Sequence, residues 1–234
     1  MNGKTIVITG GGGVLGRAAG QLAAARGAQV VLIDVVALPE GPGLRLGNVD
    51  LTNLEATTRA MNEAQSKTGR LDALLNIAGG FRWQTLEDGD IANWDALYTM
   101  NVKTAATASK AALPLLLASG EGRIVNVGAA GAVKAAAGMG AYAASKAGVM
   151  RLTESLAEEL KGRGVTVNAV LPSIIDTPAN RADMPDADFS KWVSPDELAA
   201  VMLFLVSREA GAITGALVPV TGGVEPLHPV RPSC

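Results

Sequence analysis

Tyr142 and Lys146 stand four residues apart at the start of a helical pattern, a spacing that places a phenol and an ammonium on one helix face. A nearby positive charge favours the phenolate, so we expect Lys146 to lower the pKa of Tyr142 from about 10 toward neutral pH. A phenol tuned in this way suits a general acid or base. The same spacing also occurs on ordinary amphipathic helices, so the rest of the chain must decide between the two interpretations.

A glycine-rich loop follows the first apolar run of the chain. The β-branched segment Lys4–Thr9 predicts a strand buried in a parallel sheet, and Gly10–Gly13 come directly after it. Small and apolar residues at helical spacing then continue to Gly27. Glycine clusters mostly mark ordinary turns, but a strand, a glycine loop and a helix in this order can bind a pyrophosphate at the helix N-terminus.

An acidic residue ends the second predicted strand, Ala28–Ile33. This residue, Asp34, lies 24 positions after Gly10, near the spacing at which a carboxylate accepts hydrogen bonds from an adenosine ribose. Val35 and Val36 follow it, so a ribose 2′-phosphate would meet a carboxylate and no cation. The sequence therefore favours NAD(H) over NADP(H).

A third predicted strand, Leu44–Val49, runs into Asp50. Asp50 could contact the adenine end of a cofactor. It could equally belong to the start of the helix expected at Asn53–Lys67, and the two roles are compatible.

The middle of the chain continues the alternation of strands and helices. After the fourth predicted strand, Leu71–Asn76, the small residues Ala78 and Gly79 would let a cofactor lie against the backbone. The long helical pattern Ile91–Ser119 contains Asn101, whose amide must find partners among apolar neighbours and could hold a water near the ammonium. The alternation predicts an α/β fold with a doubly wound parallel sheet and ligands at the carboxyl ends of its strands.

Composition narrows the class of protein and of partner. The 234 residues are 48% hydrophobic and 18% charged with net charge −2, which favours a single domain acting on a small molecule, without nucleic acid or membrane partners. The apolar runs Ala111–Ala118 and Ala199–Val206 are too short to span a bilayer. Met1–Gly10 lacks the features of a signal peptide, so we expect a cytoplasmic protein. A single Cys234 and a single His228 predict neither a disulfide nor a metal site.

Taken together, these residues resemble the short-chain dehydrogenase/reductase family. Thr9-Gly10 with Gly16 matches its TGxxxGxG loop, and Asn76 to Gly79 matches its NNAG motif. Asn101 matches its helix asparagine, and Tyr142 with Lys146 matches its YxxxK motif. Val167-Asn168 with Pro172 and Thr177 matches its VNxxxPGxxxT segment. The similarity covers residues 4 to 223. It implies a single-domain Rossmann fold with a seven-stranded parallel sheet.

The resemblance also implies roles. Tyr142 would be the general acid or base, Lys146 would bind the nicotinamide ribose, and Asn101 would anchor a proton-relay water. Ile175 and Thr177 would hold the carboxamide, while hydride moves between the nicotinamide and a substrate carbon. The implied cofactor-binding residues are Gly10, Gly13, Val14, Leu15, Gly16, Asp34, Asp50, Leu51, Asn76, Ala78, Gly79, Tyr142, Lys146, Pro172, Ile175 and Thr177.

The sequence departs from the family pattern at three positions. Val14 replaces the middle glycine of the phosphate loop, and Ser173 replaces the glycine after the late proline. Thirteen residues before the tyrosine, where the family has its substrate-polarising serine, this chain has Ala129, preceded by Gly128. A donor aimed at developing negative charge can contribute about 2.7 to 4 kcal/mol, so we expect simple ketones to react poorly.

One branch of the family, the dihydropteridine reductases, resembles this chain in having alanine at that position. The likeness extends to Asp34–Val36, Ala78–Gly80 and Asp176–Trp192. In that branch NADH reduces a quinonoid dihydropterin, a substrate that is already polarised. Asn101 is the ordinary family residue and argues against this branch. Four aromatic residues could line a planar substrate or could simply pack: Phe81, Trp83, Phe189 and Trp192.

The last third of the sequence completes the predicted domain, residues 1–223. Segment 178–195 is expected to be a substrate lid or a long surface loop, and residues 224–234 an irregular tail. The apolar stripe of Gly148–Leu160 and the family resemblance predict a homodimer or homotetramer. Three hypotheses remain: an NAD(H)-dependent oxidoreductase acting on a carbonyl, an alcohol or a conjugated C=N bond; a dihydropteridine reductase in the strict sense; and a non-catalytic dinucleotide sensor or scaffold.

Overall fold

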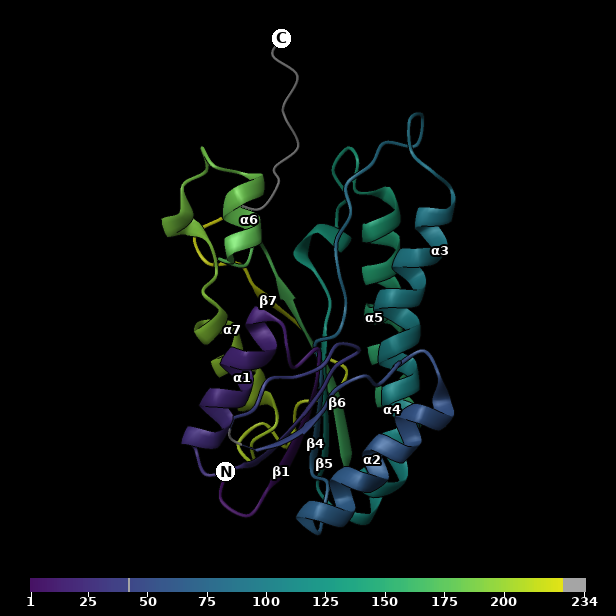
Figure 1. The fold of residues 1–234 in the computed structure, drawn as a ribbon, viewed down its shortest axis with the longest axis vertical. Helices are drawn as coiled ribbons and strands as arrows, with labels where there is room; N and C mark the ends of the chain where they lie inside the picture. The colour runs from purple at the N-terminus through teal and green to yellow at the C-terminus, as the bar shows by residue number, and fades with distance from the viewer. Residues whose placement is uncertain (42, 225–234) are drawn as a thin grey trace.

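A seven-stranded parallel sheet forms the centre of the protein (Figure 1). The computed structural model describes residues 1–41 and 43–224. The strands are β1 (Thr5–Thr9), β2 (Gln29–Ile33), β3 (Leu44–Leu46), β4 (Ala73–Asn76), β5 (Gly122–Val127), β6 (Val165–Pro172) and β7 (Leu217–Val220). Their order is β3-β2-β1-β4-β5-β6-β7 and every neighbouring pair is parallel, so the predicted doubly wound sheet is confirmed.

Helices cover both faces of this sheet (Figure 1). On one face lie α1 (Val14–Ala25) and α7 (Pro195–Leu205), and on the other α2 (Leu54–Thr68), α4 (Thr104–Ala118) and α5 (Gly140–Glu159). Alternate side chains of a strand point to opposite faces, which divides the core into two layers. In β1, Ile8 is buried in the layer under α1 and α7, while Val7 is buried in the layer under α2 and α4. The described part of the chain contains no helix with the length and apolarity that a membrane span requires.

The order in which successive strands are added to the sheet reverses between β1 and β4. The crossovers from these two strands lead to opposite ends of the sheet, and such a switch point opens a crevice at the carboxyl ends of the strands. Thr9 pairs with Asn76 across β1 and β4, and the Thr9 hydroxyl accepts hydrogen bonds from the N–H groups of Ile77 and Ala78 at 3.1 and 3.2 Å. The glycine loop after β1 is therefore held beside the loop after β4.

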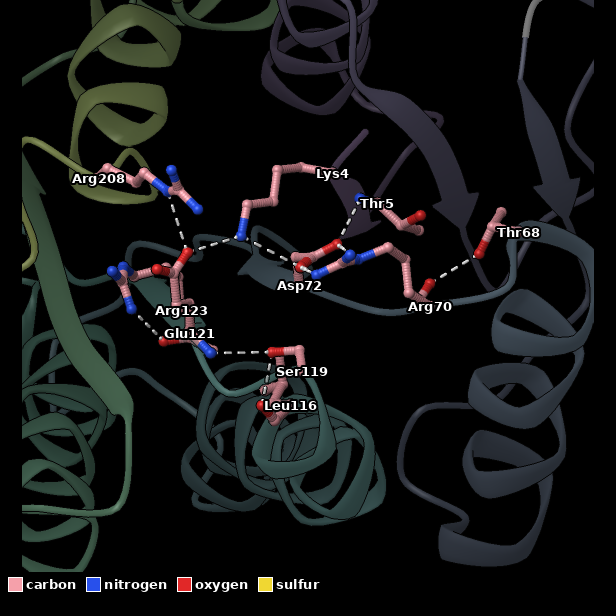
Figure 2. A network of polar contacts seen from close by, with 11 residues as sticks. Lys4, Thr5, Thr68, Arg70, Asp72, Leu116, Ser119, Glu121, Arg123 and Arg208 are labelled. Atoms are coloured by element: carbon pink, nitrogen blue, oxygen red, sulfur yellow. Dashed lines mark hydrogen bonds and ion pairs between the residues drawn. The ribbon is translucent and has the colours of Figure 1, made fainter. Parts of the chain in front are cut away.

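A network of ion pairs joins the strands at their amino ends, away from this crevice (Figure 2). Asp72, whose side chain is 3% exposed, accepts two hydrogen bonds from the guanidinium of Arg70 at 2.6 and 2.7 Å and one from the Thr5 N–H at 2.9 Å. Lys4 bridges Asp72 and Glu121. Burial raises the pKa of Asp72, but the hydrogen bonds from Arg70 and Thr5 outweigh burial and leave the pKa below its usual value. These contacts fix the starts of β1, β4 and β5 relative to one another.

Three segments differ from the sequence prediction. The helix predicted at Ile91–Ser119 is α3 (Ala92–Tyr98) and α4 joined by a π-helical turn, Thr99–Lys103, because an extra residue enters the helix there. The predicted lid contains a short helix, α6 (Pro178–Asp183), that begins at the capping side chain of Thr177, and a 3₁₀ turn at Phe189–Lys191.

The predicted third strand, Leu44–Val49, is shorter in the structure: β3 ends at Leu46, and Asn48 has φ +59°, outside the extended region. Of the predicted tail, all but Val224 lies outside the described residues, as do His228 and Cys234.

Candidate active site

A cleft of about 2170 Å³ opens at the carboxyl ends of β1, β4, β5 and β6. Loops that follow these strands supply most of its lining, and α5 supplies Tyr142 and Lys146. The structure thus brings together residues that are far apart in the sequence. Of the predicted cofactor residues, those lining the cleft are Gly10, Gly13, Val14, Leu15, Gly16, Asp34, Asp50, Leu51, Ala78, Gly79, Tyr142, Lys146, Pro172, Ile175 and Thr177.

Asn76 is the predicted cofactor residue that does not line the cleft. It is 4% exposed, and its amide donates hydrogen bonds to Ser109 Oγ at 3.0 Å and to Asn126 Oδ1 at 2.8 Å. Its position beneath the cleft floor gives it a structural role between α4, β4 and β5. The motif match alone could not distinguish this role from direct cofactor contact.

The glycine loop is crowded where it meets α1. A Cβ atom on Gly16 would overlap the carbonyl of Gly10, so only glycine fits there. Gly10 itself has φ +68° and lies against the backbone of Ala78. Val14 begins α1 and lines the cleft, and Gly13 precedes it in an extended conformation. The close turn therefore tolerates valine at the position where the family has its middle glycine.

Asp34 lies at the end of β2 with its carboxylate turned toward the glycine loop. Its Oδ2 accepts a hydrogen bond from the Gly12 N–H at 2.8 Å, and its Oδ1 accepts one from the Val36 N–H at 3.3 Å. A carboxylate accepts about four hydrogen bonds, so acceptor capacity remains for a ribose. The side chains of Val35 and Val36 are 63% and 56% exposed and add no charge beside it.

Tyr142 and Lys146 occupy the first two turns of α5, as the spacing predicted, but burial controls their ionisation. Lys146 is 6% exposed and donates a hydrogen bond to the Val127 carbonyl at 2.8 Å. Burial lowers the pKa of Lys146 to about 8 and raises the pKa of Tyr142 to about 12. The predicted lowering of the pKa of Tyr142 is therefore wrong for the chain by itself, because burial disfavours the charged form of both groups. At neutral pH, Tyr142 is a neutral phenol and Lys146 is still mostly an ammonium.

Asn101 lies in the π-helical turn and faces both the loop after β4 and helix α5. Its side chain is 1% exposed. Its Oδ1 accepts a hydrogen bond from the Gly80 N–H at 2.9 Å, and its Nδ2 donates to the Gly80 carbonyl at 3.1 Å and to Ser145 Oγ at 2.9 Å. The amide thus has the partners that its burial requires.

The part of the cleft predicted to hold the substrate is aromatic and lacks a hydroxyl at position 129. Ala129 lines the cleft directly after β5 and is 4% exposed. The ring of Phe81 meets the ring of Tyr142 edge-on, with 4.8 Å between centroids. Trp83 is 61% exposed, yet its Nε1 donates a hydrogen bond to the Ala137 carbonyl at 3.0 Å, and its ring covers Gly138, where a Cβ would overlap it.

Two of the four candidate aromatic residues lie away from this wall. Trp192 is 7% exposed and packs against Phe189, with 4.7 Å between ring centroids. The guanidinium of Arg181 lies 4.6 Å from the centre of the Phe189 ring and donates two hydrogen bonds to Asp176 at 2.6 and 2.7 Å. Trp192 and Phe189 therefore hold the segment around α6 together and do not line the cleft.

Sequence reasoning gave no role to two hydroxyl groups near the site. The Thr9 hydroxyl joins the two loops at the switch point, and the Ser145 hydroxyl joins Asn101 to α5. Ser145 stands between the two residues of the YxxxK motif, so helical spacing could have placed it beside them. The partner of Thr9 depends on strand order, which the local sequence does not contain.

A parallel sheet whose switch-point cleft contains a glycine loop, an acidic residue after β2 and a Tyr–Lys pair on one helix defines the class of Rossmann-fold oxidoreductases. Comparisons with known proteins agree. A family profile described as enoyl-(acyl carrier protein) reductase matches residues 13–225. The chain is 32% identical to 2-(S)-hydroxypropyl-CoM dehydrogenase 3 of Xanthobacter autotrophicus over 96% of this chain and 97% of that protein. It is 34% identical to meso-2,3-butanediol dehydrogenase of Serratia marcescens over 94% of each.

Solved structures give the same result. Carveol dehydrogenase from Mycobacterium avium in complex with NAD is 27% identical, with a TM-score of 0.84 over 95% of this chain and 98% of that one. Ligand-free aldohexose dehydrogenase of Thermoplasma acidophilum is 26% identical, with a TM-score of 0.88 over 98% of both chains. The protein belongs to the short-chain dehydrogenase/reductase family and is an oxidoreductase that acts on a small molecule.

Proposed function

We propose that the protein is an NADH-dependent reductase in which Tyr142 donates a proton to the substrate. The observation that carries this proposal is the half-buried Tyr142 one helical turn from the buried Lys146, in the cleft that also contains the glycine loop. A phenol whose pKa burial raises to about 12 keeps its proton at neutral pH, which suits a proton donor. The nicotinamide, when bound, supplies the hydride.

Lys146 would hold the ribose next to the nicotinamide. Its ammonium has three N–H donors, and one is used by the Val127 carbonyl. Two donors remain for a ribose hydroxyl and a water. Asn101, whose two amide protons already have partners, would anchor that water, as the family resemblance implies. These roles make Tyr142, Lys146 and Asn101 the catalytic group.

The cofactor preference rests on Asp34. A carboxylate accepts hydrogen bonds from the two ribose hydroxyls of NADH but repels the 2′-phosphate of NADPH. Val35 and Val36, the next two residues, offer no positive charge to offset that repulsion. The bound NAD of the Mycobacterium avium carveol dehydrogenase structure is in keeping with a nicotinamide dinucleotide.

The substrate preference rests on Ala129 together with Phe81 and Trp83. Without a hydroxyl at position 129, a simple ketone loses a donor worth about 2.7 to 4 kcal/mol in the transition state. A conjugated C=N compound, already polarised, depends less on that donor. The edge-on contact of Phe81 with Tyr142 and the fixed ring of Trp83 favour a flat substrate. A quinonoid dihydropterin has these properties, so a strict dihydropteridine reductase is the second candidate.

Steady-state oxidation of NADH and NADPH tests the proposal with three substrates: a quinonoid dihydropterin, a quinone and a plain ketone. We expect NADH to be oxidised, and the conjugated substrates to react faster than the ketone. Preference for the dihydropterin alone would favour the second candidate. Tight NADH binding with no turnover of any substrate would contradict both and support a dinucleotide sensor.

Three further predictions from the sequence are part of this proposal. Residues 1–223 would act as one cofactor-binding and catalytic domain, with segment 178–195 as its substrate lid. The protein would be a homodimer or homotetramer, and it would be cytoplasmic.

A further inference from the structure

Ser145 joins the two halves of the catalytic group from inside α5. It is 3% exposed and lies between Tyr142 and Lys146 in the sequence. Its Oγ accepts a hydrogen bond from Asn101 Nδ2 at 2.9 Å and donates one to the Tyr142 carbonyl at 2.8 Å. A serine hydroxyl has a single proton, so both directions are fixed by the partners.

These bonds close a ring of contacts around Tyr142. From the Tyr142 carbonyl the ring passes through Ser145 to the Asn101 amide, and from there to both backbone groups of Gly80. The next residue, Phe81, returns to Tyr142 with its side chain, 4.8 Å from the phenol ring. Because Asn101 holds both the N–H and the C=O of Gly80, a shift of its amide would move the residue that carries Phe81.

The π-helical turn explains why Ser145 is needed. Asn101 lies inside the turn Thr99–Lys103, and from there its amide reaches Gly80 and α5. A π-turn is less stable than the α-helix around it, so its geometry depends on such side-chain contacts. On the α5 side, Ser145 provides that contact.

We infer that Ser145 is a positioning residue that sets the orientation of the Tyr142 phenol through Asn101, Gly80 and Phe81. This inference rests on the proposed role of Tyr142 as proton donor. Replacing Ser145 by alanine leaves one amide proton of Asn101 unpaired and removes the contact between Asn101 and α5. We expect kcat to fall by about tenfold, the effect of one buried hydrogen bond, while NADH affinity changes little.

The test is a double-mutant cycle of Ser145→Ala and Asn101→Ala, measured as kcat with NADH and a conjugated substrate. If Ser145 acts through Asn101, the double variant is no slower than Asn101→Ala alone. Ser145→Thr, which keeps a hydroxyl that can reach the same carbonyl, should recover most of the loss. Multiplicative losses in the double variant, or no recovery with threonine, would overturn the inference.

Ser109→Ala is the matched control. Ser109 is also 3% exposed and also accepts a hydrogen bond from an asparagine amide, that of Asn76, at 3.0 Å. A general loss of stability would lower kcat in both serine variants. A positioning role predicts instead that kcat falls in Ser145→Ala and stays near wild type in Ser109→Ala. Equal losses of kcat in the two variants would contradict a positioning role.

Hydrogen exchange at the Gly80 amide gives a readout that does not need turnover. We expect Ser145→Ala to speed exchange in residues 77–83, because the Gly80 N–H is held by Asn101. Ser109→Ala should not change it. If the wild type lacks turnover but this exchange difference is present, the proposed reaction is wrong and the ring of contacts around Tyr142 is supported. If turnover is present and the exchange rates are equal, Ser145 does not hold the ring.

Discussion

Replacing Lys146 by methionine should make the stability of the protein respond differently to pH. Burial lowers the pKa of Lys146 from 10.5 to about 8 in the folded chain. Between these values the unfolded chain binds more protons than the folded one, so the free energy of unfolding rises with pH. The cost of the buried ammonium is largest below pH 8 and disappears toward pH 10.5. Linkage gives a change of about 2 kcal/mol between pH 7 and pH 10.

The assay is urea unfolding of wild type and Lys146→Met at pH 7, 8, 9 and 10. We expect the difference in free energy of unfolding, variant minus wild type, to fall by about 2 kcal/mol across this range. Loss of the hydrogen bond to the Val127 carbonyl changes this free-energy difference by the same amount at every pH, so it does not affect the dependence on pH. Tyr142, whose pKa burial raises to about 12, affects both proteins alike.

Lys110→Met, at an exposed position of α4, provides the control for loss of a surface charge. A difference for Lys146→Met that is constant with pH, or that rises with pH, would show that the ammonium is well solvated in the folded protein. The assignment of Lys146 as a buried cation would then be refuted.

Three further substitutions test the cleft. Ala129→Ser should raise kcat/KM for a plain ketone by about a hundredfold, because it restores a donor to the substrate oxygen; no gain would mean that another group already polarises the substrate. Asp34→Ala should weaken NADH binding by about tenfold to a hundredfold, measured by fluorescence titration, because a charged hydrogen-bond acceptor is lost; an equal loss for NADPH would point instead to damage of the glycine loop. Arg181→Leu removes the contacts with Asp176 and Phe189, so KM for the substrate should rise several-fold with NADH affinity unchanged, and an unchanged KM would exclude a lid function for α6.

Much of the fold could be predicted from the sequence because each buried strand has an apolar run of its own. The segments Thr5–Thr9 and Gln29–Ile33 are β-branched and buried, and both were expected. The start of α7 was also predictable, because Ser194 and Glu197 form a capping box by local hydrogen bonds. Local signals of this kind do not depend on the rest of the fold.

The features that sequence missed depend on contacts between distant segments. Asn101 of the π-helical turn contacts Gly80 and Ser145, and no pattern within the helix encodes those partners. The direction of the pKa shift of Tyr142 was wrong for a related reason. Spacing shows which charge is near, but it cannot show that burial outweighs that charge.

Candidate site residues were predicted more accurately as a set than one by one. Fifteen of the expected cofactor residues line the cleft, because strand ends in a parallel sheet meet at one edge. Asn76 matched its motif equally well but is buried elsewhere, at 4% exposure, and Trp192, for which lining a substrate and packing were both left open, packs at 7% exposure. Burial of an individual side chain is a property of the packed structure, and a motif does not contain it.

Tyr142→Phe tests most directly whether Tyr142 supplies the proton. The variant retains the ring that packs against Phe81 and removes only the hydroxyl. Turnover of NADH with a conjugated substrate should fall by about a hundredfold or more, while NADH affinity by fluorescence titration stays close to that of wild type. Unchanged turnover with unchanged NADH affinity would contradict the role given to Tyr142.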